Sequence, residues 1–217
     1  MSAAAQLTFP PHPGSEPALS RRRATTASRP AAEVAFRGFL QSLGLDTAEP
    51  HLADTPARVA RAYAELFAGL DEQARPRLTT FPNTGSRTAM IVLAAVPFYS
   101  MCAHHFLPFF GRAHIGYVPG DRLVGLSKLA RALEFYSRRP QVQERLTEET
   151  ASLLMEETGA AGVLVLTEAR HLCMEMRGVS KPGGVTSALA VRGTLEEPAR
   201  QQEFFERVRA SRSLPEV

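Results

Sequence analysis

Two pairs of strand-like segments, separated by two amphipathic helical patterns, constrain the fold of this chain more than any other feature. The first pair is MIVLAAVPFYSM and FLPFFGRAHIGYV, which ends in the turn signal PGD. The second pair is GVLVLTEARHLCMEM and TSALAVRGTL. In GVLVLTEARHLCMEM we expect His171 and Cys173, two positions apart, to lie in one strand and face the same side. Runs of strands interrupted by runs of helices predict an α+β fold with a largely antiparallel sheet.

Helical patterns account for most of the remaining sequence. Apolar residues recur at helical spacing over roughly 31–43 and 55–70, where Thr55 can cap the second helix and Pro56 suits its first position. Another helix is expected to begin at Pro198. The chain therefore divides into a disordered tail at 1–30 that is rich in Pro, Ser, Ala and Arg, an N-terminal helical segment at 31–75, and a folded domain at 76–217.

Composition argues against several classes of protein. No apolar run approaches the roughly 20 residues that span a bilayer, and the N-terminus lacks the hydrophobic stretch of a secretory signal. We therefore expect a soluble, cytoplasmic protein without membrane partners, although the arginines of the tail also fit an organelle targeting peptide. The net charge of +3 is small, and the densest basic run, at 21–23, lies in the tail, so nucleic acid is not an expected partner.

Both cysteines of the chain stand beside histidines. Cys102 is followed by His104 and His105, and Cys173 is preceded by His171. Thiolates and imidazoles are preferred ligands of zinc, and a catalytic zinc takes three protein ligands and leaves one position open for water. Two thiolates and one histidine could therefore hold zinc, and the other two histidines could transfer protons. The alternative is that the cysteines are small buried apolar residues and that the histidines are hydrogen-bonded structural groups.

A second cluster of polar residues lies in the two helical patterns between the strand pairs. Ser127, Lys128 and Arg131 lie at a predicted helix start, where unpaired backbone N–H groups favour anions. Gln143 and Glu144 open the next helix. A phosphate site is one interpretation, and a solvated helix face is the other. Because no glycine-rich phosphate loop occurs in the chain, a nucleotide would have to be held by other means.

Five motifs, in order, resemble the GTP cyclohydrolase I family. They are DTPARVARAY, SMCAHH, GLSKLAR, QVQERLT and HLCMEMRGV, and the similarity extends from roughly residue 50 to 209. The resemblance implies the tunnelling fold, with helices on one side of an antiparallel sheet, and a homo-oligomer in which two five-membered rings form a decamer with active sites at subunit interfaces. It also implies hydrolytic opening of the imidazole ring of GTP to give 7,8-dihydroneopterin triphosphate and formate, in tetrahydrofolate, other pterin or deazapurine biosynthesis.

The same resemblance assigns roles to individual residues. Cys102, His105 and Cys173 match the ligands of one zinc ion per subunit, which activates water for attack on C8 of guanine. His104 and His171 match the proton-transfer histidines, and Ser127, beside the ribose, is grouped with them as catalytic. Glu144 matches the carboxylate that accepts hydrogen bonds from guanine N1–H and the amino group, with Gln143 next to it.

The groups expected around the ribose and triphosphate are cationic. Those that match the family, apart from Ser127, are Lys128, Arg131, Arg177, Arg58 and Arg61. In the family they come from neighbouring subunits, so we expect a lone chain to be inactive. Ala103 departs from the pattern because the family commonly has Glu there, a carboxylate that could orient a neighbouring group.

Two other functions are compatible with the sequence. One is a relative with the same fold that acts on a different purine or pterin. The other is a non-catalytic zinc protein that binds nucleotide or nucleic acid. A structural zinc takes four protein ligands, and a nucleic-acid module needs a basic stripe with exposed aromatic residues. The surplus histidines and the modest charge favour the enzyme.

Overall fold

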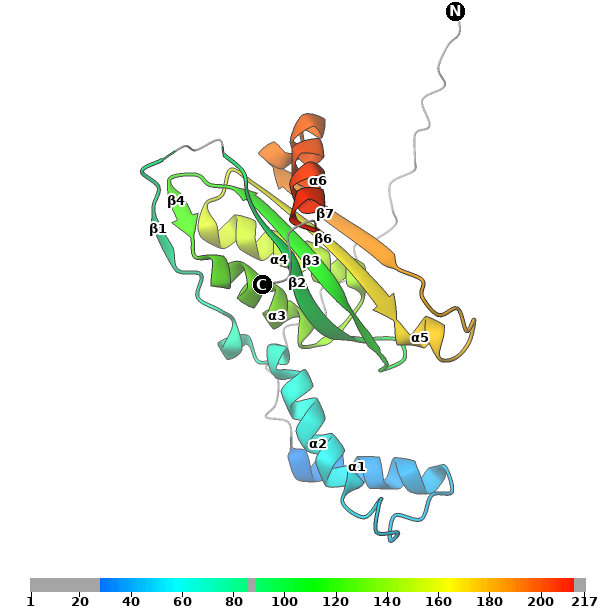
Figure 1. Ribbon diagram of the computed structural model, residues 1–217. Helices are drawn as coiled ribbons and strands as arrows, with labels where there is room; N and C mark the ends of the chain where they lie inside the picture. The colour runs from blue at the N-terminus through cyan, green and yellow to red at the C-terminus, as the bar shows by residue number, and fades with distance from the viewer. Residues whose placement is uncertain (1–27, 86–88, 213–217) are drawn as a thin grey trace, which may run out of the picture.

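The protein, described as a computed structural model over residues 28–85 and 89–212, is built around a twisted five-stranded sheet (Figure 1). The strand order is β5-β2-β3-β6-β7. These strands are β2 (Ile91–Cys102), β3 (Pro108–Val118), β5 (Pro140–Gln141), β6 (Gly162–His171) and β7 (Thr186–Gly193). All pairs are antiparallel except that of β2 with the short β5. β1 (Thr80–Pro82) and β4 (Arg122–Val124) form a separate antiparallel pair. The predicted α+β fold with a largely antiparallel sheet is confirmed.

Helices cover both faces of the sheet, not one face as expected. α3 (Leu126–Ser137) and α4 (Gln143–Thr158) pack on one face, and α6 (Pro198–Arg212) packs on the other (Figure 1). The reason is that β6 is apolar on both sides: Val163 and Val165 enter the α3 and α4 core, whereas Leu164 packs with Phe204 of α6. Gly116 leaves room for the Phe204 ring on this face of the sheet, because a Cβ at position 116 would lie 2.7 Å from Cδ2 of Phe204.

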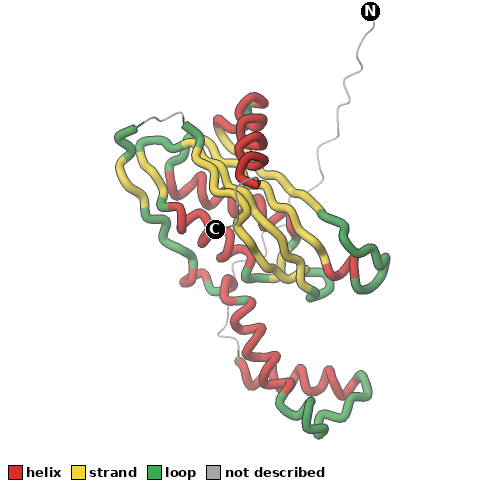
Figure 2. Tube along the Cα trace, viewed as in Figure 1, coloured by secondary structure: helices red, strands yellow, loops and turns green. Residues whose placement is uncertain are grey.

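An N-terminal hairpin of two helices extends from the sheet domain (Figures 1 and 2). Its helices are α1 (Arg29–Ser42) and α2 (Thr55–Leu66), followed by the short helical turns η1 (Ala68–Leu70) and η2 (Glu72–Ala74). Both predicted helices are confirmed, but Asp54, not Thr55, holds the cap position of α2, and Thr55 instead bonds to the carbonyl of His51. Apart from residues 28–30, the predicted tail lies outside the described residues. None of the helices in the described ranges is long and apolar enough to cross a membrane.

The expected strand through Cys173 is wrong. β6 ends at His171, and the next four residues form a single helical turn, α5 (Leu172–Glu175). The pairing of β6 with β3 stops where Phe109 faces His171, because β3 begins at Pro108, which has no N–H to continue the ladder. The chain beyond His171 therefore forms local hydrogen bonds, such as that from the N–H of Met176 to the carbonyl of Leu172.

Candidate active site

Cys102, His105 and Cys173 come together at one end of the sheet. β2 ends at Cys102, β6 leads into α5, and β3 lies between these strands. One ligand atom from each residue lies within 4.8 Å of the others, and the described residues contain no other His, Cys, Asp or Glu cluster of this kind. Sulfur and nitrogen ligands of a tetrahedral zinc lie roughly 3.5–3.8 Å apart, given bond lengths of about 2.3 and 2.0 Å. A small closure of the cluster would therefore suffice to hold a metal.

His105 presents its Nδ1 to the cluster. Nδ1 lies 3.9 Å from Sγ of Cys102, and Nε2 lies 3.1 Å from Nη1 of Arg177. Burial and the adjacent Cys102 thiol raise the pKa of Cys173, against a smaller opposing effect of Arg177. Burial and the neighbouring sulfur therefore disfavour the Cys173 thiolate, and a bound cation would offset that penalty. The donor set is thus suited to a thiolate-binding metal.

His171 is held in one tautomer by the fold. Its Nε2 lies 2.8 Å from Oε1 of Gln143, and its ring stacks on buried Phe109 at 4.9 Å between centroids. Because an amide oxygen only accepts, Nε2 must carry the proton, which leaves the Nδ1 lone pair free in the neutral ring. Burial lowers the pKa of His171, and the Glu144 carboxylate opposes this shift.

The orientation of the Gln143 amide is fixed by its own partners. Its Nε2 donates to the carbonyl of Thr167, to Oγ1 of Thr167 and to the carbonyl of Thr186, each at 3.0 Å. Thr147 closes the network through a 2.7 Å bond to the carbonyl of Gln143 and a 2.8 Å contact with Oγ1 of Thr167. Gln143 is only 2% exposed. Its side chain therefore faces His171 and the protein interior, not solvent.

The neighbouring polar groups are open to solvent. Glu144 is exposed in the first turn of α4, where the partial positive charge of the helix end favours a carboxylate. His104 and Arg177 are also exposed. The site thus combines a cluster that could hold a metal, a half-buried imidazole with an unprotonated nitrogen and an exposed carboxylate.

Comparison with known proteins identifies the family. The sequence model described as GTP cyclohydrolase I matches residues 32–209. The chain belongs to the GTP cyclohydrolase I family. The GTP cyclohydrolase 1 of Mycobacterium ulcerans (strain Agy99) is 48% identical over 185 residues, 83% of this chain and 91% of that protein. The GTP cyclohydrolase 1 of Clostridioides difficile (strain 630) is 48% identical over 164 residues, 75% of this chain and 86% of that protein. The GTP cyclohydrolase 1 of Streptococcus pyogenes is 44% identical over 186 residues, 85% of this chain and 95% of that protein.

The residues expected around the substrate of a GTP cyclohydrolase I lie in two separate groups. One group surrounds the metal-binding cluster. Ser127 and Lys128 lie at the start of α3, while the end of α3 contacts β2 through a 2.8 Å bond from Oγ of Ser100 to the carbonyl of Ser137. Ten residues of helix, about 15 Å, separate Ser127 from that end. Figure 1 accordingly places β4, which leads into α3, at the opposite end of the sheet from α5.

The remaining arginines are distributed over other surfaces. Arg131 lines a hollow between α3 and the turns η1 and η2. Arg58 and Arg61 are exposed on α2, where Arg58 pairs with Asp54 at 3.1 Å. Within one chain, therefore, Arg177 lies beside the cysteine and histidine cluster, whereas Ser127 and Lys128 lie at the far end of α3.

Phe109, Thr147 and Thr167 support the site but were missed from the sequence. They belong to ordinary apolar and helical patterns, and only the register of β3 against β6 and the position of α4 bring them to His171 and Gln143. His114 is buried, with Nδ1 accepting from the N–H of Ala95 and Nε2 3.2 Å from Glu168. It is thus a packed histidine with hydrogen-bond partners.

Proposed function

We propose that this protein is a zinc-dependent GTP cyclohydrolase I that converts GTP and water to 7,8-dihydroneopterin triphosphate and formate. The observation that carries the proposal is the Cys102, His105 and Cys173 cluster, next to a histidine of fixed tautomer. Two sulfurs and one imidazole are ligands that zinc prefers, and three protein ligands leave a position open. When bound, zinc supplies a Lewis acid that lowers the pKa of water toward neutrality.

His171 would serve as a proton-transfer group. Its Nδ1 has a free lone pair, and its lowered pKa keeps the ring neutral near pH 7, so it can accept a proton and later return it to a leaving nitrogen or ribose oxygen. His104 is placed as the second proton-transfer group on its family match. Gln143 would act through His171 by fixing its tautomer, since its own N–H groups are already bonded within the protein.

Glu144 is assigned to the guanine base. Its carboxylate can accept from N1–H and the 2-amino group, whereas a glutamine there would present an N–H to one of these donors. Glu144→Gln should therefore raise the KM for GTP about ten- to a hundredfold, the range for a charged hydrogen bond, with zinc content unchanged. Steady-state kinetics and metal analysis check this result. Glu156→Gln, at an exposed position later in α4, is the matched control, and an unchanged KM in the Glu144 variant would remove the guanine role.

The separation of the two residue groups supports an active site shared between chains. The metal-end group comprises Cys102, His104, His105, Gln143, Glu144, His171, Cys173 and Arg177. The second group, Ser127, Lys128 and Arg131, lies along α3 and would bind the ribose and triphosphate of a GTP held by a neighbouring chain. Four phosphate charges need several cations, and arginine offers paired donors to phosphate oxygens. Arg58 and Arg61 would contribute in the same way from α2.

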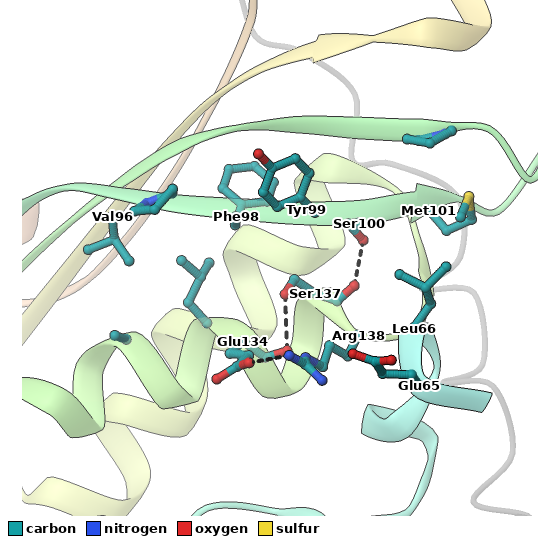
Figure 3. Close-up of a pocket in the computed structure, with 14 residues that line it drawn as sticks. Glu65, Leu66, Val96, Phe98, Tyr99, Ser100, Met101, Glu134, Ser137 and Arg138 are labelled. Carbon is teal, nitrogen blue, oxygen red and sulfur yellow. Dashed lines mark hydrogen bonds and ion pairs between the residues drawn. The ribbon is translucent and has the colours of Figure 1, made fainter. Parts of the chain in front are cut away.

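The sheet edges offer a way to assemble such chains into a ring. In the described residues β2 pairs with β5 only at Met101 and Cys102, and β7 pairs only with β6, so both edges have free length. A groove of about 500 Å³ follows β2 (Figure 3). It is lined by residues 96–101 of β2, by α3 and by the end of α2. Tyr99 at this edge is 70% exposed and Leu189 on β7 is 41% exposed. Edge-to-edge pairing of β7 with β2 of the next chain would close a tunnelling-fold ring of five chains. Two such rings, stacked on each other, would form a decamer.

The reaction itself tests the proposal. Purified protein with one zinc per chain should release formate from GTP and give a product that becomes a fluorescent pterin after oxidation. ATP should not react, because it lacks the N1–H and 2-amino donors that Glu144 would bind. Formate detection and fluorescence after oxidation provide the two readouts. Zinc-loaded protein that converts GTP only to products formed without formate would overturn the proposed function.

A further inference from the structure

The turn that carries the metal-ligating histidine has an unusual backbone. It joins β2 to β3 and is closed by hydrogen bonds from the N–H of Phe106 to the carbonyl of Cys102 and from the N–H of Cys102 to the carbonyl of Leu107, both at 2.9 Å. Phe106, directly after His105, has φ of 53°. A bulky side chain disfavours this left-handed conformation, so surrounding contacts must hold it.

Two aromatic side chains from the N-terminal hairpin contact the Phe106 ring. Tyr63 stacks on it at 6.4 Å between centroids and 14° between planes. Phe67 meets it edge-on at 5.7 Å and 87°, and Tyr63 and Phe67 contact each other at 5.3 Å. The three rings form a closed triangle, in geometries that aromatic pairs favour. We call Tyr63, Phe67 and Phe106 the aromatic clamp.

The hairpin side of the clamp is itself fixed to the sheet domain. Just after Phe67, the N–H of Gly69 donates to the carbonyl of Arg138 at 2.9 Å, and Nη2 of Arg139 donates to the carbonyl of Gly69 at 2.6 Å. A Cβ on Gly69 would lie only 2.0 Å from the carbonyl oxygen of Phe135, so the two backbones are in direct contact. The clamp thus links the metal-binding turn to an anchored part of the chain.

We propose that Phe106, held by Tyr63 and Phe67, is a positioning residue of the metal centre. The clamp holds the turn in the conformation that directs His105 toward the two thiols before metal arrives, so less conformational freedom is lost when metal binds. This inference rests on the proposed metal site. It adds a role for the N-terminal hairpin, whose aromatic side chains would strengthen metal binding by packing against the turn that carries His105. None of the three rings ligates the metal.

Metal affinity provides the test. Full-length protein is stripped of metal under reducing conditions and titrated with Zn²⁺ against a chromophoric chelator of known affinity. Phe106→Ala and Tyr63→Ala should bind Zn²⁺ about ten- to a hundredfold more weakly than wild type, the range for residues that orient metal ligands. Tyr63→Phe should bind as wild type does, because the stacking ring is retained. Phe67→Leu, which keeps apolar volume, supplies a milder variant should Tyr63→Ala fail to fold, and it too should bind more weakly.

Phe39→Ala is the matched control. It removes an aromatic ring from the same hairpin, and among the ring pairs of the described residues Phe39 pairs with Phe36 and not with a clamp ring. It should keep wild-type affinity. Equal loss of affinity in Phe39→Ala would show a general effect of the hairpin and overturn the positioning role. Wild-type affinity in Phe106→Ala and Phe67→Leu would overturn it as well. Wild-type protein that binds no Zn²⁺ would instead overturn the metal centre itself, and the inference with it.

Discussion

His171→Ala is expected to retain zinc and lose turnover, with kcat reduced by about 10²- to 10⁴-fold, the usual contribution of a general acid or base. Metal should stay bound because the cluster within 4.8 Å consists of Cys102, His105 and Cys173 and does not include His171. Turnover should fall because the group that accepts and returns protons is gone. Metal analysis and formate release, measured on the same preparation, check both parts.

Two further variants separate the roles around His171. Cys173→Ala should lose zinc as well as turnover, because two of three ligands hold a metal poorly. Gln143→Leu should keep zinc and reduce kcat with little change in KM, since the leucine cannot accept from Nε2 and no longer fixes the tautomer. Metal loss in His171→Ala would show that His171 is a metal ligand and not a proton-transfer group. A large rise in KM without a fall in kcat in Gln143→Leu would contradict the tautomer role and indicate that Gln143 binds substrate.

The fold was largely predictable because its sheet is built from segments with clear patterns. β2, β3, β6 and β7 correspond to the four strand-like runs, and α3, α4 and α6 begin within a residue or two of the expected positions. Helix starts are well marked here by Pro56, Pro198 and the change from period two to helical spacing. The position of α6 was not predictable, because a strand that is apolar on both faces, such as β6, does not show which element covers which face.

Part of the site was predictable for a simple chemical reason. Cysteine and histidine are scarce, so their pairing at 102–105 and 171–173 already indicates one metal cluster. The local geometry was not predictable. Cys173 reaches the cluster from a helical turn, because the strand pairing stops at His171, opposite Phe109, whereas the expected strand continued through Cys173. The Gln143 network depends on the contact of α4 with β6 at Thr167. Nothing in the sequence of either segment indicates that the two lie next to each other.

The arrangement of the second residue group leads to a test of shared sites. A chain with both Lys128 and Arg131 changed to Ala keeps an intact metal end, and a His171→Ala chain keeps an intact α3. Each variant alone should show little activity, because every site in its homo-oligomer lacks one component. In a mixed oligomer, some sites combine the metal end of the first chain with α3 of the second. Random assembly of equal amounts should make about one quarter of the sites complete, since the two components come from different chains across a repeated interface.

Co-expression of the two variants with different affinity tags, followed by sequential purification, isolates the mixed oligomer for the formate assay. The matched control is a mixture of His171→Ala with Cys173→Ala, in which both changes lie at the metal end, so that no combination of chains yields a complete site. We expect activity near a quarter of wild type in the first mixture and none in the control. The reason is that roughly 15 Å of α3 separate its start from its contact with β2, so the start of α3 would serve the metal end of another chain. Doubly tagged oligomers of the first mixture that are no more active than the parents would mean that each chain completes its own site, and would exclude the shared-site arrangement.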